Sequence, residues 1–252
     1  MTQIRNQTQM QYTSIQDIVA HLEAEPAEEG GSIYHPIPFP EFAHLKTSSD
    51  PEQVRAKWEM IESALRRAFP GGLAGRKVLD VGANCGFYTF SLAQQGAAVT
   101  AFEPHPRYGP IGRFLAAEKK LPVEWHDGPF TVEPIRGRRF DAALMLSVFQ
   151  WMAEGGPRLA AASAELRALS EACDCLIFEL AFNRGKSCLH TTKLNHYAAL
   201  VDLLRETTGY RHFQFLGRPR IWRGSPRYLV LCSNRPELED SLRWRITRGV
   251  RI

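Results

Sequence analysis

The stretch from Lys77 to Pro106 constrains the fold more than any other part of the chain. It reads KVLDVGANCGFYTFSLAQQGAAVTAFEPHP: an apolar run from Val78, a glycine-rich turn, helical spacing from Phe87, and a second apolar run that ends in Glu103. Gly96 stands where a glycine commonly ends a helix. This order predicts a strand, a helix and a second strand of one parallel sheet, with an acid at the carboxyl end of the second strand.

The turn between these strands (DVGANCG) predicts a binding site for a nucleoside cofactor. Its glycines let the backbone approach a ligand, and Glu103 can accept hydrogen bonds from ribose hydroxyls. A dinucleotide fingerprint would carry glycine at the position of Asn84. Asp80 is badly placed for a diphosphate but suits an ammonium or a sulfonium, which argues against a nicotinamide dehydrogenase. The alternative is a glycine turn that closes the strand-helix unit without any ligand.

The residues Asp80, Gly82, Asn84 and Gly86 resemble the first motif of class I S-adenosylmethionine-dependent methyltransferases, [E/D]-x-G-x-G/N-x-G. The resemblance is specific over residues 76–150 and only architectural beyond them. It implies an α/β fold with a Rossmann-like seven-stranded methyltransferase sheet, helices on both faces and an N-terminal helical lid. It also implies that the cofactor is S-adenosyl-L-methionine and that the chain is a methyltransferase.

The resemblance extends to positions around the first motif. An acid after the third predicted strand often receives the adenine amino group in this family, and Asp127 fits that role, although Asp-Gly also forms turns. The fourth strand, Phe140 to Leu146, leads to Ser147, where the family's strand end passes between cofactor and acceptor. The expected cofactor-binding residues are Lys57, Asp80, Gly82, Asn84, Gly86, Glu103, Pro104, Asp127, Gly128 and Ser147.

Lys57 belongs to a predicted helix that begins after Asp50 and runs to about Phe69, directly before the first strand. The pair Lys57-Trp58 resembles one in bacterial tRNA wobble-uridine carboxymethyltransferases, where the lysine holds the carboxylate of the cofactor. Here the spacing to the glycine turn is longer by about one helical turn. The alternative for Lys57 is a solvated lysine on the surface of a helix.

Methyl transfer to a hydroxyl or a protonated amine requires a base, and histidine has a suitable pKa. We expect this base to be His35, on a proline-rich arm, or His190, after the fifth strand; His126 and His105 are weaker candidates. Glu179 interrupts the apolar fifth strand, where an unpaired carboxylate would be costly, so it needs a partner or a role. The expected substrate-binding residues are Tyr34, Gln150, Trp151, Glu179 and Asn183.

The chain is expected to divide into an N-terminal arm and helical lid over residues 1–70, a cofactor-binding methyltransferase domain over 71–235 and a basic tail over 236–252. Within the domain, strands over 212–216 and 228–232 are predicted to be antiparallel, as in this family.

Bulk properties set further limits. The net charge of +4 permits an anionic partner without requiring one, and the arginine-rich tail leaves RNA binding open as the less expected case. There is no apolar leader and no membrane-spanning run, so we expect a cytoplasmic protein without a membrane partner. The five cysteines lack metal-ligand spacing, which predicts reduced thiols and no metal.

Together these features predict a methyltransferase for a small polar acceptor such as a sugar, a natural product or another metabolite, methylated on oxygen or nitrogen. Two alternatives stay open: an RNA nucleoside-modifying enzyme, and a catalytically inactive S-adenosylmethionine-binding protein. We expect a monomer or a homodimer.

Overall fold

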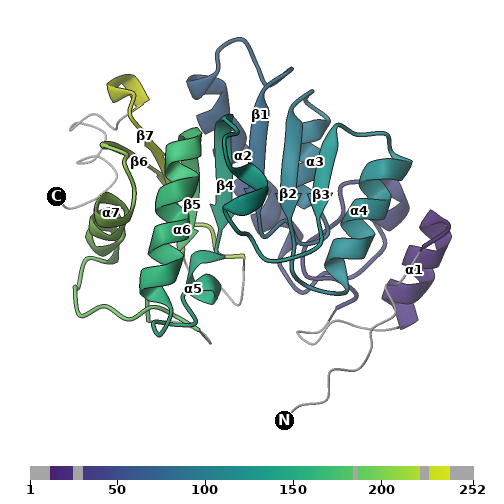
Figure 1. The fold of residues 1–252 in the computed structure, drawn as a ribbon. Helices are drawn as coiled ribbons and strands as arrows, with labels where there is room; N and C mark the ends of the chain where they lie inside the picture. The colour runs from purple at the N-terminus through teal and green to yellow at the C-terminus, as the bar shows by residue number, and fades with distance from the viewer. Residues whose placement is uncertain (1–11, 25–30, 184–186, 222–226, 239–252) are drawn as a thin grey trace.

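The fold is a seven-stranded sheet with the strand order β3-β2-β1-β4-β5-β7-β6 (Figure 1). This computed structural model describes residues 12–24, 31–183, 187–221 and 227–238; the basic tail predicted over 236–252 lies almost wholly outside them. The strands are β1 (Lys77–Val81), β2 (Ala98–Phe102), β3 (Val123–His126), β4 (Phe140–Leu146), β5 (Cys173–Leu180), β6 (His212–Gly217) and β7 (Tyr228–Ser233).

The first five strands are parallel to one another, and β7 pairs antiparallel with both β5 and β6. Both pairings of β7 are therefore antiparallel, as predicted. Because the direction reverses twice, β7 alone runs against the other six strands, and β6 returns to the direction of β5. The chain moves from β1 outward through β2 and β3, then crosses back to β4, so the carboxyl ends of β1 and β4 form a topological switch point.

The helices are α1 (Ile15–Ala24), α2 (Pro51–Ala68), α3 (Phe87–Ala93), α4 (Tyr108–Glu118), α5 (Phe149–Met152), α6 (Leu159–Ala172) and α7 (His196–Thr207). Asp50 caps α2 as predicted, since its carboxylate accepts from the amides of Glu52 and Gln53 at 2.9 and 3.3 Å. The short helix α5 was not predicted, because four residues are too few for a helical pattern to emerge in the sequence.

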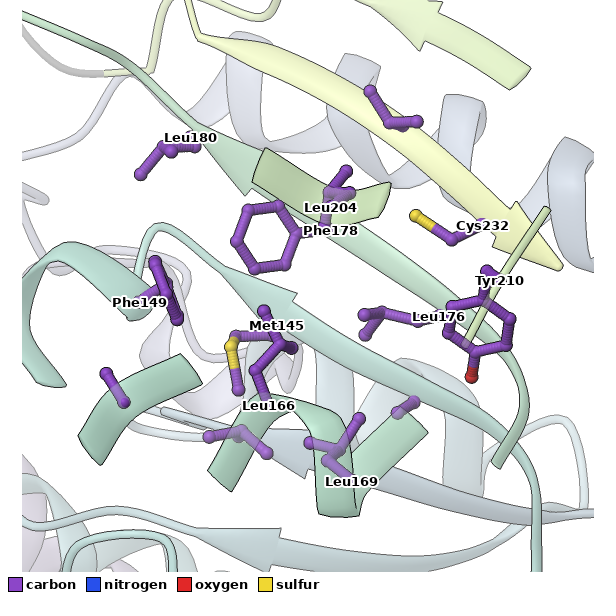
Figure 2. Close-up of a cluster of buried hydrophobic side chains, with 14 of the residues drawn as sticks. Met145, Phe149, Leu166, Leu169, Leu176, Phe178, Leu180, Leu204, Tyr210 and Cys232 are labelled. Atoms are coloured by element: carbon purple, nitrogen blue, oxygen red, sulfur yellow. The ribbon is translucent and has the colours of Figure 1, made fainter. Parts of the chain in front are cut away.

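The strands bury both of their faces. Alternate residues such as Met145 and Phe178 point toward α5, α6 and α7 on one face (Figure 2). Their neighbours, such as Leu144 and Ile177, point toward α2 and α3 on the other. This explains the nearly continuous apolar composition of β4 and β5, because a strand covered on both sides has no polar face.

The N-terminal residues cover two different regions. Helix α2 packs along the sheet face through residues such as Ile61 and Leu65, so it belongs to the helical layer of the sheet. Helix α1 and the proline-rich arm, residues 32–49, form a third apolar cluster with α4. Tyr34 and His35 of the arm reach the carboxyl ends of the strands, and we call this side of the sheet the carboxyl edge; α5 lies there too, at the bottom of Figure 1.

Gly112 of α4 packs directly against β3, and its replacement tests this contact. A Cβ at position 112 would lie 2.1 Å from the indole ring of Trp125. We expect Gly112→Ala to lower the free energy of unfolding by roughly 1–3 kcal/mol through overpacking, even though alanine favours helix. Urea unfolding measures this. Gly71→Ala is the matched control because no atom lies within 4 Å of its Cβ position; equal losses in both variants would contradict the prediction.

Candidate functional site

The carboxyl edge carries unusual backbone geometry. Asn84, Ser147 and Asn183 follow β1, β4 and β5, and each has a positive φ, of 54°, 60° and 59° respectively. Such conformations are uncommon for residues other than glycine and cluster at ligand sites. The three adjacent strands of the switch point therefore all end in a constrained turn, which fixes where the following side chains point.

The glycine turn after β1 is closely packed. The amides of Gly82 and Ala83 donate to the carbonyl of Phe102 on the neighbouring strand at 2.9 and 3.0 Å. Gly82 has φ +80°, and a Cβ there would lie 2.3 Å from a methyl group of Val148. Gly86 has φ +93° and lies against Phe90. Both glycines are thus required by conformation and by space, which the sequence motif alone could not show.

Glu103, at the end of β2, reaches back to this turn. One carboxylate oxygen accepts from the amide of Asn84 at 2.6 Å and the other from the amide of His105 at 2.7 Å. Burial raises the pKa of Glu103 to about 7, because desolvation outweighs these two hydrogen bonds. Each oxygen keeps a second lone pair. The carboxylate is therefore held in place and can still accept hydrogen bonds from a ligand.

Asp80, in the penultimate position of β1, is the second buried acid of the site. Its carboxylate accepts from the hydroxyl of Thr89 at 2.6 Å. Burial raises its pKa to about 6, against the hydrogen bond from Thr89 and the charge of Lys57. A buried carboxylate with so little compensation suits a positively charged ligand group.

Lys57 of α2 and Glu179 of β5 form an ion pair at the carboxyl edge. The Nζ atom lies 3.1 and 3.3 Å from the two carboxylate oxygens, and the side chains are 3% and 1% exposed. The hydroxyl of Ser147 also donates to Glu179. Glu179 thus has the partner that its buried position demanded, and Lys57 is not a solvated helix lysine.

The charges around Glu179 decide its ionisation. Burial pushes the pKa of Glu179 upward, yet the charges of Lys57 and Arg227 and the two side-chain hydrogen bonds outweigh burial and hold the pKa below its usual value. Desolvation lowers the pKa of Lys57, against the attraction of Glu179. Glu179 is therefore a fixed negative charge that joins α2 to the sheet.

The arm brings Tyr34 and His35 to the same region. The ring of His35 meets that of Tyr88 edge to face at 5.9 Å, and the ammonium of Lys57 lies 5.0 Å from the Tyr88 ring centroid. Nδ1 of His35 lies 3.0 Å from the hydroxyl of Ser49. Tyr88 therefore connects the arm, α2 and α3 at the carboxyl edge.

Among the described residues, three buried polar atoms at this edge have no hydrogen-bond partner: Oδ1 of Asn84, the hydroxyl of Tyr88 and Oε1 of Gln150. Leaving such a group unsatisfied costs about 1–3 kcal/mol. A ligand with donors and acceptors would relieve that cost. Together with the acids Asp80 and Glu103, these atoms fit a nucleoside cofactor that carries hydroxyls and a cationic group.

The remaining predicted residues are more dispersed. Asp127, before Gly128, pairs with Nε of Arg113 at 3.2 Å, and Pro104 is exposed beside Glu103. Trp151 is 58% exposed on α5. Asn183 closes a loop through two hydrogen bonds with the backbone of Thr191, both 2.9 Å long, so its amide already has structural partners.

The histidine candidates separate clearly. His190 is exposed, with Nε2 3.5 Å from the sulfur of Cys188. His126 stacks on Phe102, and its Nε2 atom lies 2.9 Å from a carboxylate oxygen of Glu124. His35 alone among these three is buried in contact with Tyr88 at the carboxyl edge.

Sequence reasoning missed Tyr88, Thr89, Ser49 and Arg227. Tyr88 and Thr89 lie in the helix after the glycine turn, where polar groups two and three residues beyond Gly86 could have drawn attention. Ser49 could be read only as a residue before a helix cap. Arg227 belongs to an arginine-rich connection that offered no sign of which guanidinium turns inward.

Within the described residues no group of three or more potential metal ligands is found, and the five cysteines are free thiols. None of the described helices combines the length and apolar character that crossing a bilayer requires.

The ion pair at the carboxyl edge gives a stability prediction. Removing the charge of Lys57 leaves Glu179 uncompensated, so we expect Lys57→Met to lower the free energy of unfolding by about 3–5 kcal/mol. The double variant Lys57→Met/Glu179→Gln should recover much of this loss, because the neutral amide introduced at position 179 needs no counter-charge. Urea unfolding of the wild type, of both variants and of Glu179→Gln gives the four free energies of a double-mutant cycle. Strictly additive losses would show that the two charges do not interact.

Sequence comparison finds relatives over part of the chain. Residues 78–171 match a family model described as a methyltransferase domain. Over 100 residues the chain is 31% identical to the ubiquinone biosynthesis O-methyltransferase of Methylobacterium sp. (strain 4-46). The aligned stretch covers 39% of each of the two proteins. A protein of the same description from Methylocella silvestris is 34% identical over 86 residues. The chain thus spans well under half the length of these curated relatives.

Similar solved structures share the fold over most of the chain. The bifunctional kinase-methyltransferase WbdD superposes with a TM-score of 0.65 and 22% identity, over 86% of this chain and 46% of that one. The N-terminal domain of EvdMO1, crystallised with S-adenosylhomocysteine, gives a TM-score of 0.58 and 16% identity, over 87% and 96%. At these identities the likeness concerns the fold alone. The fold, the glycine motif and the family model agree that residues 78–171 form a methyltransferase domain of the class I S-adenosylmethionine-dependent type.

Proposed function

We propose that this chain transfers a methyl group from S-adenosylmethionine to a small polar acceptor. The observation that carries the proposal is the pair of buried acids, Asp80 and Glu103, on either side of a glycine turn that also holds the unpartnered Oδ1 of Asn84. When bound, S-adenosylmethionine supplies a methyl group activated by a sulfonium.

The chain offers a distinct group for each polar part of this cofactor. Glu103 would accept the ribose hydroxyls with its remaining lone pairs, and Asp80 would attract the ammonium. Lys57 has three donor hydrogens, and its contacts with the two oxygens of Glu179 leave at least one for the cofactor carboxylate. Asp127 and Gly128, beyond β3, would border the adenine, and Gly82, Gly86, Pro104 and Ser147 would shape the walls.

His35 is our choice for the base. It is buried at the carboxyl edge against the ring of Tyr88, whereas His190 is exposed and contacts Cys188. Burial, with the charges of Lys57 and Arg227, lowers the pKa of His35 well below 6.5, so the imidazole is neutral and able to accept a proton at neutral pH.

The acceptor is proposed to bind between the arm and α5. Tyr34 and Gln150 would offer polar contacts, and the exposed indole of Trp151 would stack on a sugar or an aromatic ring. Oxygen is the methylated atom in the names of the curated relatives, and the EvdMO1 domain was also crystallised with S-adenosylhomocysteine and D-fucose. A hydroxyl of a sugar or an aromatic ring is therefore the acceptor that we would test first.

Calorimetric titration with S-adenosylmethionine, S-adenosylhomocysteine and NADH tests the cofactor. Micromolar affinity for the first two alone supports the proposal, and absence of binding by either contradicts it. Labelled methyl uptake by a panel of monosaccharides, catechols and bulk RNA then tests the acceptor. Tight cofactor binding with no labelled product in any pool would instead favour an inactive binding protein, and labelled RNA would favour nucleoside modification.

The pKa values of Glu103 and Asp80 predict how cofactor affinity depends on pH. Ribose hydroxyls bind the ionised Glu103, so affinity should rise as pH increases through about 7 and level off above it. In Glu103→Gln the increase in cofactor affinity should instead occur near pH 6, where Asp80 ionises. Cofactor binding should also weaken by roughly 1–3 kcal/mol. Calorimetry from pH 5 to about 9 measures both effects.

The stability of the ligand-free protein should move in the opposite direction. A carboxyl whose pKa is raised on folding binds its proton more tightly in the folded state, so its contribution to stability falls as pH rises from about 4.5 to about 7. Glu133→Gln, an exposed acid, is the matched control and should leave both pH profiles unchanged. An unchanged affinity profile in Glu103→Gln would rule out Glu103 as the ribose ligand.

A further inference from the structure

His35 ends a chain of hydrogen bonds within the arm. Its Nδ1 atom lies 3.0 Å from the hydroxyl oxygen of Ser49, and this hydroxyl donates to the carbonyl of Tyr34 at 2.7 Å. The amide of Ser49 donates to the same carbonyl at 3.0 Å. Ser49 is itself buried, at the point where the arm leads into α2. Three residues of the arm thus form one local network.

The positions of the hydrogens in this network follow from the donors available. Two oxygens 2.7 Å apart need a hydrogen between them, and the carbonyl of Tyr34 has none. The single hydroxyl hydrogen of Ser49 must therefore point at that carbonyl. The contact between Ser49 and His35 then requires a hydrogen on Nδ1. In a neutral imidazole this leaves Nε2 as the acceptor.

The groups that face His35 keep the imidazole neutral. Lys57 of α2 and Arg227, the residue directly before β7, both place a positive charge near His35. Tyr88 of α3 and Tyr34 of the arm contribute uncharged rings. Desolvation, with the two positive charges, holds the pKa of His35 well below its usual value. Neutrality and the bond to Ser49 together select one tautomer.

We propose that Ser49 is a positioning residue that fixes His35 in the Nδ1–H tautomer, so that Nε2 takes the proton of a hydroxyl acceptor during methyl transfer. The inference rests on the proposed function and deepens it. The acceptor oxygen forms its bond to the methyl carbon as the bond from that carbon to sulfur breaks, and sulfur keeps the electron pair. The acceptor proton passes to Nε2 and leaves an imidazolium.

A weakly basic imidazole is sufficient because the acceptor proton leaves late in the methyl-transfer step. Positive charge grows on the acceptor oxygen only as the new bond forms, so the hydroxyl becomes acidic late in the step and a strong base is unnecessary. Repulsion from Lys57 and Arg227 then favours loss of the proton from the imidazolium to solvent. The same charges that lower the basicity of His35 thus help to return it to its neutral form after each turnover.

Nuclear magnetic resonance of the imidazole nitrogens tests the tautomer without cofactor or acceptor. In the full ¹⁵N-labelled chain, with the His35 signals assigned by their loss in His35→Gln, we expect the pattern of the Nδ1–H form. Ser49→Ala should shift the pattern toward Nε2–H, and Ser49→Thr should retain it. A wild-type Nε2–H pattern, or no change in Ser49→Ala, would overturn the positioning role even if S-adenosylmethionine binds as proposed.

Turnover tests the proton transfer. With a catechol or monosaccharide that accepts label in the wild-type assay, we expect Ser49→Ala to lower kcat by about 10-fold, with S-adenosylmethionine affinity unchanged, and Ser49→Thr to restore it. Ser170→Ala is the matched control, because Ser170 is also a buried serine that donates to a backbone carbonyl, here in α6. Equal kcat in the wild type and Ser49→Ala, or an equal loss in Ser170→Ala, would overturn the proposal.

Discussion

The buried ion pair between Lys57 and Glu179 is the interaction on which the arrangement of the carboxyl edge depends. It joins α2, which precedes the sheet in sequence, to β5, 122 positions further along. A buried charge pair is seldom worth more than an apolar contact of the same size, but breaking it is costly. The pair therefore fixes how α2 meets the sheet, since any other placement would bury an unpaired carboxylate.

This placement determines what else can lie at the edge. The ammonium of Lys57 faces Tyr88, and its charge reaches both Asp80 and His35. It therefore favours the ionised form of the acid and the neutral form of the imidazole at the same time. The charge of Lys57 thus lowers the pKa of both groups. Asp80 is left better suited to bind a cationic ligand group, and His35 is left neutral and able to accept a proton.

The fold was predictable because its signals are local. The glycine turn, the acid at Glu103, the Asp50 cap and the apolar runs each mark an element within a few residues, and the structure has those elements close to the predicted bounds. The partner of Glu179 was not predictable in this way. The sequence showed that a buried carboxylate needed one, but the pairing with Lys57 depends on how a helix packs across the whole sheet.

The network of Ser49 and His35 shows the same limit at shorter range. The two residues are 14 positions apart, yet their contact depends on how the proline-rich arm folds back on itself, with Ser48 donating to the carbonyl of Ile33 at 2.8 Å. No periodicity marks such a turn, because proline suppresses regular structure. The arm thus brings to the edge of a common fold side chains that neither the strands nor the glycine motif supply, and chemistry particular to this chain is to be sought there.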